Sequence, residues 1–182
     1  MELNNSPLKF KGMNKISAHH SKFIILLLSL ALPFLGSCDD EDDVAGIFTG
    51  KTWKMTGIYE KGSVKDPYKG YWSNEASFNA SMKLLEEPGN FNIIFEGSVS
   101  DKTIKGLFTG RATNTNLSGN WAANGGNNSF FATPKETTDN DALGNAFIEG
   151  LRNAHKYEGD YDNLRIYFTI GSSERFILFH VK

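Results

Sequence analysis

The 182-residue chain contains a single cysteine, Cys38, and four histidines. One thiol cannot close a disulfide within the chain, and it rules out a zinc site built mainly from thiolates. Only His155 and His180 follow Cys38. We expect His155 near the end of a helix, where a cation is favoured, and His180 in a strand. The sequence therefore predicts no metal and no other cofactor.

An excess of positive charge is also missing, since 19 Lys and Arg stand against 21 Asp and Glu. From Cys38 onward the counts are 15 and 20, a net charge of −5, and from Val44 onward they are 15 and 15. The excess acids form one run: Asp39, Asp40, Glu41, Asp42 and Asp43. A neutral domain has no basic field for phosphates, so we expect no nucleic-acid partner.

No apolar run is long enough to cross a membrane. The longest, Phe23–Phe34, has 12 residues, whereas a spanning helix needs about 20. It follows the positively charged stretch Lys15–Lys22, and this order is typical of a secretory signal. We assign residues 1–37 to a lipoprotein signal peptide, with Met13 as a candidate for the true start.

Four residues directly after the apolar run, Leu35-Gly36-Ser37-Cys38, resemble the lipobox of bacterial lipoproteins. Small side chains before the cut fit the signal peptidase, and the thiol after it accepts diacylglycerol. The resemblance implies that Cys38 becomes the lipid-bearing first residue and that the membrane is a partner through this anchor. Two or three acyl chains hold a protein stably, whereas one is marginal.

The acidic run 39–43 then has two interpretations. Like charges at this density stay solvated, so we assign residues 38–48 to a tether between lipid and domain. The run also resembles the surface-export signal of Bacteroidetes-type lipoproteins, which implies the outer membrane and an exposed cell surface. Asp39 alone would instead resemble the inner-membrane retention signal of enteric bacteria, but five acids favour export.

Beyond the tether, apolar and polar residues alternate with period two, the pattern of half-buried strands. It covers five stretches: 53–60, 91–96, 104–109, 117–121 and 164–170. Residues 129–133 are expected as a returning strand after a turn, and the apolar run 176–181 as a buried final strand. Asn124-Gly125-Gly126-Asn127 and Gly171-Ser172-Ser173 predict turns between neighbouring strands.

The period becomes helical near the end of the chain. One apolar stripe is formed by Ala142, Leu143, Ala146, Phe147, Gly150, Leu151 and Ala154. Asp139 or Asp141 is expected to cap this helix, and Gly159 to end it. A weaker pattern suggests a second helix that is capped by Ser73 and stops at Pro88-Gly89.

Catalytic motifs are absent. The chain has no Gly-x-Ser-x-Gly, no phosphate-binding loop and no Ser-x-x-Lys in its usual context, and its Asp pairs at 139/141 and 160/162 fit caps and turns. We therefore expect no enzyme. We would abandon that expectation if His155 or His180 shared a cleft with two carboxylates.

The aromatic residues divide into two groups. Trp53 and Trp121 fall on inward strand positions and are expected in the core. Tyr68, Tyr71 and Trp72 lie in a segment without regular pattern, where rigid rings suit contact with a sugar or protein partner. These three are our candidate binding residues.

Together the patterns predict a mainly β (α+β) domain over residues 49–182. We expect a small antiparallel, closed or nearly closed barrel of seven or eight strands, with one helix before the final hairpin. Gly50-Lys51-Thr52-Trp53-Lys54-Met55, the Gly- and Asn-rich 110–121, the helix and Asp162-Asn163-Leu164-Arg165-Ile166 resemble, in order and spacing, the META domain. That family is typified by a heat-inducible bacterial outer-membrane lipoprotein, and a lipocalin-like barrel of small Bacteroidetes lipoproteins is a related expectation.

The expected function is that of a non-enzymatic, lipid-anchored envelope protein whose barrel binds a protein, a glycan or a small apolar ligand, or has a structural role. One alternative is a lipocalin-type carrier with an apolar ligand inside the barrel. Another is an inhibitor of secreted proteases. A barrel interior filled by side chains would argue for binding on the outer surface.

Overall fold

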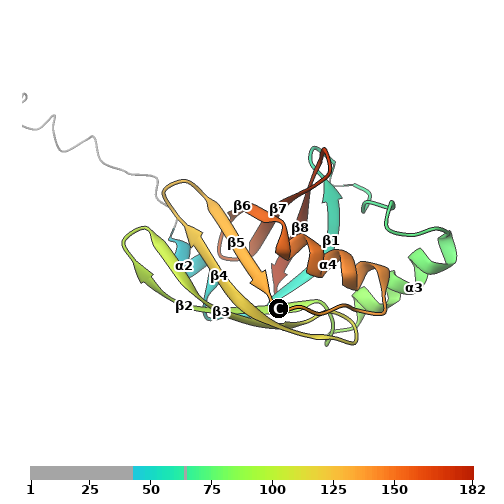
Figure 1. Ribbon diagram of the computed structural model, residues 1–182, viewed down its shortest axis with the longest axis horizontal. Coiled ribbons are helices and arrows are strands. Elements are labelled where there is room, and N and C mark those ends of the chain that lie inside the picture. The colour runs from blue at the N-terminus through green and yellow to red at the C-terminus, as the bar shows by residue number, and fades with distance from the viewer. Residues whose placement is uncertain (1–42, 64) are drawn as a thin grey trace, which may run out of the picture. The chain divides into compact units, whose positions relative to one another are not determined.

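The computed structural model describes residues 43–63 and 65–182, which form a closed antiparallel barrel of eight strands (Figure 1). Each strand pairs with its neighbours in the chain, and β1 also pairs with β8. The strands are β1 (Trp53–Glu60), β2 (Asn92–Ser100), β3 (Thr103–Arg111), β4 (Asn116–Asn124), β5 (Ser129–Pro134), β6 (Ala154–Gly159), β7 (Asn163–Ile170) and β8 (Ser173–Val181). The predicted mainly β barrel is confirmed.

Alternation points every second side chain of a strand into the barrel, and these inward positions are mainly apolar. In β4 and β5 buried residues alternate with exposed or half-buried ones along the whole strand. The two predicted turns form as well: Asn124 pairs with Ser129, and Ile170 pairs with Ser173. Gly171 has a φ of 61° in the second turn, a conformation that glycine adopts without strain.

The barrel has two weak seams. β1 pairs with β2 at Trp53–Ile93 and Lys54–Asn92, and β5 pairs with β6 at a single position, Ser129–Lys156. By contrast, β2 pairs with β3 along all nine residues. The barrel therefore consists of a first half-sheet, β2 to β5, and a second half-sheet, β6, β7, β8 and β1.

Two helices lie at these seams. Helix α2 (Val44–Phe48) packs beside β2, where Thr49 forms an isolated bridge with Phe95. Helix α4 (Ala142–Arg152) packs against β5 on one side and β7 and β8 on the other (Figure 1). Both helices bury apolar side chains in the common core. The two helices thus close the barrel where the strands are only weakly paired.

Helix α2 shifts the domain boundary that we expected at residue 49. Val44, Ile47 and Phe48 are buried, and Phe48 is fully inaccessible. Residues 44–48 are thus part of the packed domain and not of the tether. Asp43 caps the helix by accepting a hydrogen bond from the Gly46 backbone N–H (3.0 Å).

Helix α4 confirms the predicted stripe but ends earlier than expected. Asp141 caps it by accepting from the backbone N–H groups of Leu143 and Gly144, at 2.9 and 3.1 Å. The helix stops at Arg152, and β6 follows from Ala154 to Gly159. The expectation that Gly159 ends the helix was wrong, and so was the helical position of His155. A register shift between Ala154 and Lys156 gives β6 inward residues three apart, which imitates a helix.

Aromatic rings fill the barrel interior. The ring of Phe48 lies within 5.5 Å, centroid to centroid, of four other rings, from β2, β4, β5 and β6. The largest fully buried side chains are Trp53, Tyr157, Phe48, Phe91, Phe95, Phe108, Phe130, Phe147, Phe168 and Phe179. Trp121 is 3% exposed. The predicted core positions of Trp53 and Trp121 are confirmed.

A buried carboxylate ties the β3–β4 turn to α4. Asp139 accepts hydrogen bonds from the backbone N–H groups of Thr113, Asn114 and Thr115 at 3.0–3.2 Å, and from the Thr113 hydroxyl. Burial raises the pKa of Asp139, but the hydrogen bonds outweigh it and hold the pKa below its ordinary value. Asp139 therefore has a structural role.

Helix α3 (Glu75–Glu86) occupies the region of the weaker predicted helix. Its cap is Asn74, one residue beyond the expected Ser73, with the Asn74 side chain accepting from the Ser77 N–H at 2.9 Å. The buried Ser81 hydroxyl donates to Asp141 (2.6 Å). This bond connects α3 to the start of α4.

Candidate functional site

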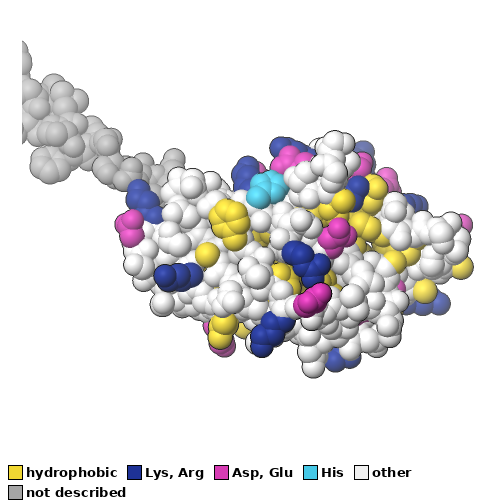
Figure 2. All heavy atoms as spheres, in the orientation of Figure 1, with side chains coloured by type: hydrophobic (Ala, Val, Ile, Leu, Met, Phe, Trp, Pro, Cys, Tyr) yellow, Lys and Arg dark blue, Asp and Glu magenta, His cyan; other side chains and the backbone are white. Residues whose placement is uncertain are grey.

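The outer face of the first half-sheet carries large apolar side chains that none of the described residues covers. Leu107 on β3 is 60% exposed and Phe131 on β5 is 57% exposed. Between them, β4 presents the short side chains of Asn120 and Ala122, which pair with Leu107 and Phe131 through the strand register. Apolar side chains are visible at the surface over β4 and β5 in Figure 2. The large side chains on β3 and β5 therefore flank the short side chains on β4 and form a groove.

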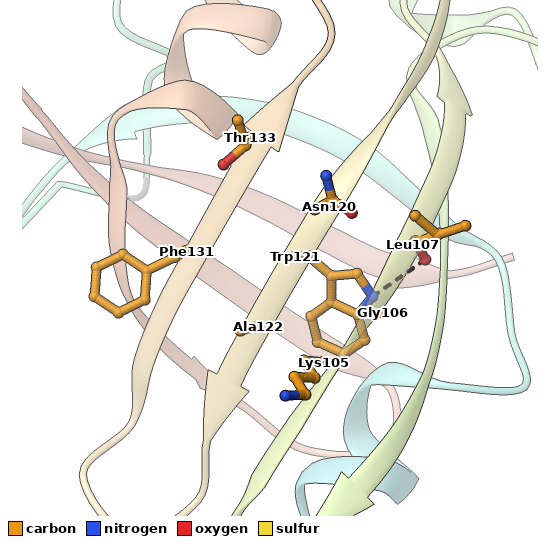
Figure 3. Close-up of a pocket in the computed structure, with 8 residues that line it drawn as sticks. All are labelled: Lys105, Gly106, Leu107, Asn120, Trp121, Ala122, Phe131 and Thr133. Atoms are coloured by element: carbon orange, nitrogen blue, oxygen red, sulfur yellow. Dashed lines mark hydrogen bonds between the residues drawn. The ribbon is translucent and has the colours of Figure 1, made fainter.

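This outer groove has a volume of about 440 Å³ (Figure 3). Its lining consists of Lys105, Gly106, Leu107, Asn120, Trp121, Ala122, Phe131 and Thr133. The volume falls in the range of small-molecule sites, which combine apolar walls with a few polar groups. Figure 3 shows Phe131 and Leu107 on opposite sides of β4.

The floor of the outer groove is fixed by a tryptophan and a glycine. The Trp121 indole Nε1 donates to the carbonyl oxygens of Glu96 and Leu107, at 3.0 and 3.1 Å. Gly106 lies opposite Trp121 in the register, and a Cβ there would lie 2.0 Å from the Glu96 carbonyl oxygen. The close approach of β2 and β3 at this point therefore requires glycine.

Three polar side chains at the outer groove have no partner among the residues that the structure describes. Asn120, Thr133 and Lys105 make no side-chain hydrogen bond or ion pair within residues 43–63 and 65–182. They offer an amide, a hydroxyl and an ammonium group to a ligand. Apolar walls and uncommitted polar groups occur together here.

On the second half-sheet, the outward aromatic side chains are covered by neighbouring residues. Phe176 and Tyr167 point away from the core but are only 3% and 7% exposed. Arg165 covers the Phe176 ring at 5.6 Å, and Lys156 covers the Tyr167 ring at 5.4 Å. Burial, followed by a hydrogen bond from the Tyr167 hydroxyl to Glu158 (2.7 Å), raises the pKa of Tyr167 to about 12. The rings of Tyr59 and Tyr167 also pack on Phe176, at 5.6 and 5.5 Å, so this face is closed by its own charged and aromatic side chains.

A polar hollow of about 540 Å³ lies further along the second half-sheet. It is lined by Glu158, Gly159, Asp160, Asn163, Arg165, Leu178 and His180. His180 thus shares a cleft with two carboxylates, which meets the condition under which we would abandon the non-enzyme expectation, so the state of these three groups decides whether it stands.

The carboxylates of this polar hollow are already engaged. Hydrogen bonds from Lys156 and Tyr167 lower the pKa of Glu158, and backbone N–H groups of Asp162 and Asn163 lower the pKa of Asp160. Lowered values make both groups weak bases at neutral pH. The His180 side chain forms no hydrogen bond or ion pair with the residues the structure describes. The hollow therefore lacks an oriented acid–base pair.

The described part of the chain contains no cluster of three or more His, Cys, Asp or Glu side chains placed to hold a metal ion. His155, expected at a helix end, lies on β6 and faces Glu174 at 3.4 Å. His180 lies exposed on β8, the predicted strand.

The candidate binding residues Tyr68, Tyr71 and Trp72 have contacts within the domain. The Arg175 guanidinium lies 3.7 Å from the Tyr68 ring centroid, and it donates to the Tyr71 hydroxyl at 3.4 Å. The Trp72 indole N–H donates to Ser81 (2.7 Å). All three are half-buried, and they fasten the segment before α3 to the barrel end. Their role in binding stays a prediction.

Most of the predicted processing signal lies outside the described residues: Leu35, Gly36, Ser37, Cys38, Asp39, Asp40, Glu41 and Asp42. Asp43, the last acid of the export signal, is described. Hydrogen bonds from the Gly46 N–H and the Tyr161 hydroxyl hold the pKa of Asp43 below its ordinary value.

Our sequence reasoning missed the residues of the outer groove, although a signal for them exists. Phe130 and Phe131 are adjacent within a strand, and adjacent side chains of a strand face opposite sides. One ring of the pair must therefore point outward. The doublet Leu107-Phe108 on β3 follows the same rule.

Fold and surface together define a class of protein: an eight-stranded up-and-down barrel domain with a filled interior and a groove on its outer face. The chain belongs to the family described as "Domain of unknown function (DUF4847)", whose model matches residues 39–181. The match includes α2, in agreement with its place in the packed domain.

A solved relative supports this assignment. The crystal structure of a DUF4847 family protein from Bacteroides vulgatus ATCC 8482 is 27% identical to this chain, with a TM-score of 0.55. The likeness covers 75% of this chain and 96% of that one. A comparison with curated proteins found no match. Among the described residues, no helix has both the length and the apolar character required to cross a membrane.

Proposed function

We propose that this protein is a lipid-anchored, non-enzymatic component of the bacterial envelope that binds its ligand on the outside of a filled barrel. The proposal rests on one observation, namely that aromatic side chains fill the interior of the barrel. Ten of the large side chains there are fully buried aromatics, and one of them, Phe48, contacts the rings of Phe95, Trp121, Phe130 and Tyr157. Binding then falls to the outer surface, where the outer groove combines a suitable volume with uncommitted polar groups.

The filled interior disfavours a carrier of apolar ligands. A carrier barrel must leave room for its cargo, and here aromatic rings take that room. The META-like or lipocalin-like kinship remains part of the proposal. Its support is the order of eight antiparallel strands, with α4 before the last three of them.

The lipid anchor rests on the lipobox around Cys38, and surface exposure rests on the acids behind it. The test is labelling with an alkyne fatty acid in a Bacteroides host, comparing the wild-type chain with Cys38→Ser. We expect label on the wild type and none on the variant. Protease treatment of intact cells should then degrade the labelled protein while a periplasmic marker survives. An unlabelled wild-type chain that still carries residues 1–37 would overturn the anchor.

External binding is tested separately with an apolar fluorescent probe, N-phenyl-1-naphthylamine, added to the purified domain. A filled interior predicts no quenching of the buried Trp53, and any saturable binding of the probe should be lost in Phe131→Ala, because the outer groove and not the interior is open to it. Saturable binding that is lost when a core ring is changed, but kept in Phe131→Ala, would favour the carrier.

One observation favours a second candidate, a hydrolytic enzyme, because His180 shares the polar hollow with Glu158 and Asp160. The engaged carboxylates argue against it. We expect hydrolysis of p-nitrophenyl acetate at the rate of an unrelated control protein, and the same rate for His180→Ala. Turnover that disappears in His180→Ala would replace our proposal with this candidate.

A further inference from the structure

The outer groove differs from the outer face of the second half-sheet, because the described residues leave its large apolar side chains uncovered. The same chain covers outward rings on the second half-sheet with Arg165, Lys156 and Glu158. No described ring contact or cation covers Phe131. A large apolar ring left bare on a strand marks a contact surface.

The groove chemistry selects an amphipathic ligand. Phe131 and Leu107 can pack against C–H groups, while Asn120 and Thr133 can both donate and accept hydrogen bonds. A purely apolar ligand would leave these polar groups unpaired, and a flat hydrophilic ion would leave the ring uncovered. A saccharide ring satisfies both, because it presents a C–H face and a rim of hydroxyls.

The charge in the outer groove indicates which kind of saccharide it would prefer. Lys105 is the one charged residue among its lining residues, and no carboxylate lines it. An ammonium group favours a ligand with an anionic group within reach. On the basis of the proposed external binding, we propose that the outer groove binds a saccharide, and that it prefers a sugar bearing a carboxylate, a uronic acid, to a neutral one.

The test is isothermal titration calorimetry of residues 38–182, kept intact, with tetragalacturonate and with maltotetraose. We expect binding of both, with tetragalacturonate at least threefold tighter at low salt. The difference should fall toward one in 0.5 M NaCl, where the charge of Lys105 is screened. Amide chemical shifts should move on β3, β4 and β5.

Variants locate the site. Phe131→Ala should weaken both saccharides at least tenfold. Lys105→Met should remove the preference for the uronate and keep the binding of maltotetraose. The matched control is Val99→Ala, another exposed apolar residue (49%) of the first half-sheet that lies outside the groove lining; it should bind as the wild type does.

The outcomes are distinct. Absence of heat and of shifts with both saccharides overturns the saccharide inference, while fatty-acid labelling and the naphthylamine result decide the proposed function independently. Binding that is equal in wild type and Phe131→Ala overturns the location. Equal affinity for the two saccharides at low salt overturns the preference for uronate.

Discussion

The two half-sheets of the barrel handle outward apolar side chains in opposite ways. On the second, Phe176 and Tyr167 are covered by neighbouring charged groups and are nearly inaccessible; on the first, Leu107 and Phe131 are more than half exposed. In the sequence, covered and uncovered side chains look the same, because each is an apolar residue at an outward position of a strand. The comparison teaches that cover by neighbouring strands, and not residue type, distinguishes a structural ring from a contact ring.

A substitution of Phe48, whose ring contacts both half-sheets, should reduce the stability of the domain most. Phe48→Ala removes the ring that contacts Phe95, Trp121, Phe130 and Tyr157. We expect a loss of about 4 kcal/mol in the free energy of unfolding, typical of a large-to-small change in a core. Urea unfolding followed by tryptophan fluorescence measures it. A loss below about 1 kcal/mol would mean that the half-sheets do not depend on α2.

The comparison itself is tested by a pair of identical substitutions. Phe176→Ala should cost about 3 kcal/mol, because a covered ring is lost, whereas Phe131→Ala should change the stability by less than about 0.5 kcal/mol. Both are measured by the same urea titration. Equal losses would contradict the distinction between the two faces.

The link from the β3–β4 turn to α4 should have an intermediate effect. Asp139→Asn replaces a carboxylate that accepts several N–H groups, and we expect a loss of about 2 kcal/mol at pH 7. The pKa of Asp139 is lower in the folded state, so its contribution is present above about pH 4 and is lost as the pH falls.

Urea titrations between pH 7 and pH 3 should therefore show the two proteins converging in stability. Asp101→Asn, at an exposed turn acid, is the matched control and should remain within about 0.5 kcal/mol of the wild type at pH 7. A gap between Asp139→Asn and wild type that persists unchanged at pH 3 would contradict the role of the charge.

The smallest effect concerns the cover of Tyr167. Its pKa of about 12 exceeds the usual value near 10, so the folded state holds this proton between about pH 10 and pH 12 while the unfolded chain loses it. The contribution of Tyr167 to stability therefore falls across that interval. Absorbance at 295 nm should show a tyrosine that titrates near pH 12, and Glu158→Gln should lower the pKa of this tyrosine. An unchanged titration in that variant would contradict the hydrogen bond.

Much of the fold could be predicted because alternation and turn residues are local signals. Seven strands, the start of α4 and the turns at Asn124 and Gly171 follow from them. β6 was missed because a register shift breaks its alternation at Ala154. α2 was missed because five residues behind an acidic run carry too little pattern, and its stability comes from burial of Phe48 in distant strands.

The site was harder to predict for a related reason. Tyr68, Tyr71 and Trp72 stood out because they lie in an irregular segment, yet Arg175, which contacts two of them, is about a hundred residues away. The bare ring of Phe131 stood inside a regular strand and attracted no notice. Exposure depends on which side chains neighbouring strands bring alongside, and that information is not local.

Helix α2 has a mechanical consequence. Any force applied to the chain ahead of Asp43 reaches the domain through five residues whose last ring is enclosed by aromatics from both half-sheets. The chain cannot peel away there one residue at a time. The Phe48 ring can be released only if the barrel opens. The force needed to unfold the domain from this end is therefore set by the packing of the barrel core and not by a terminal segment.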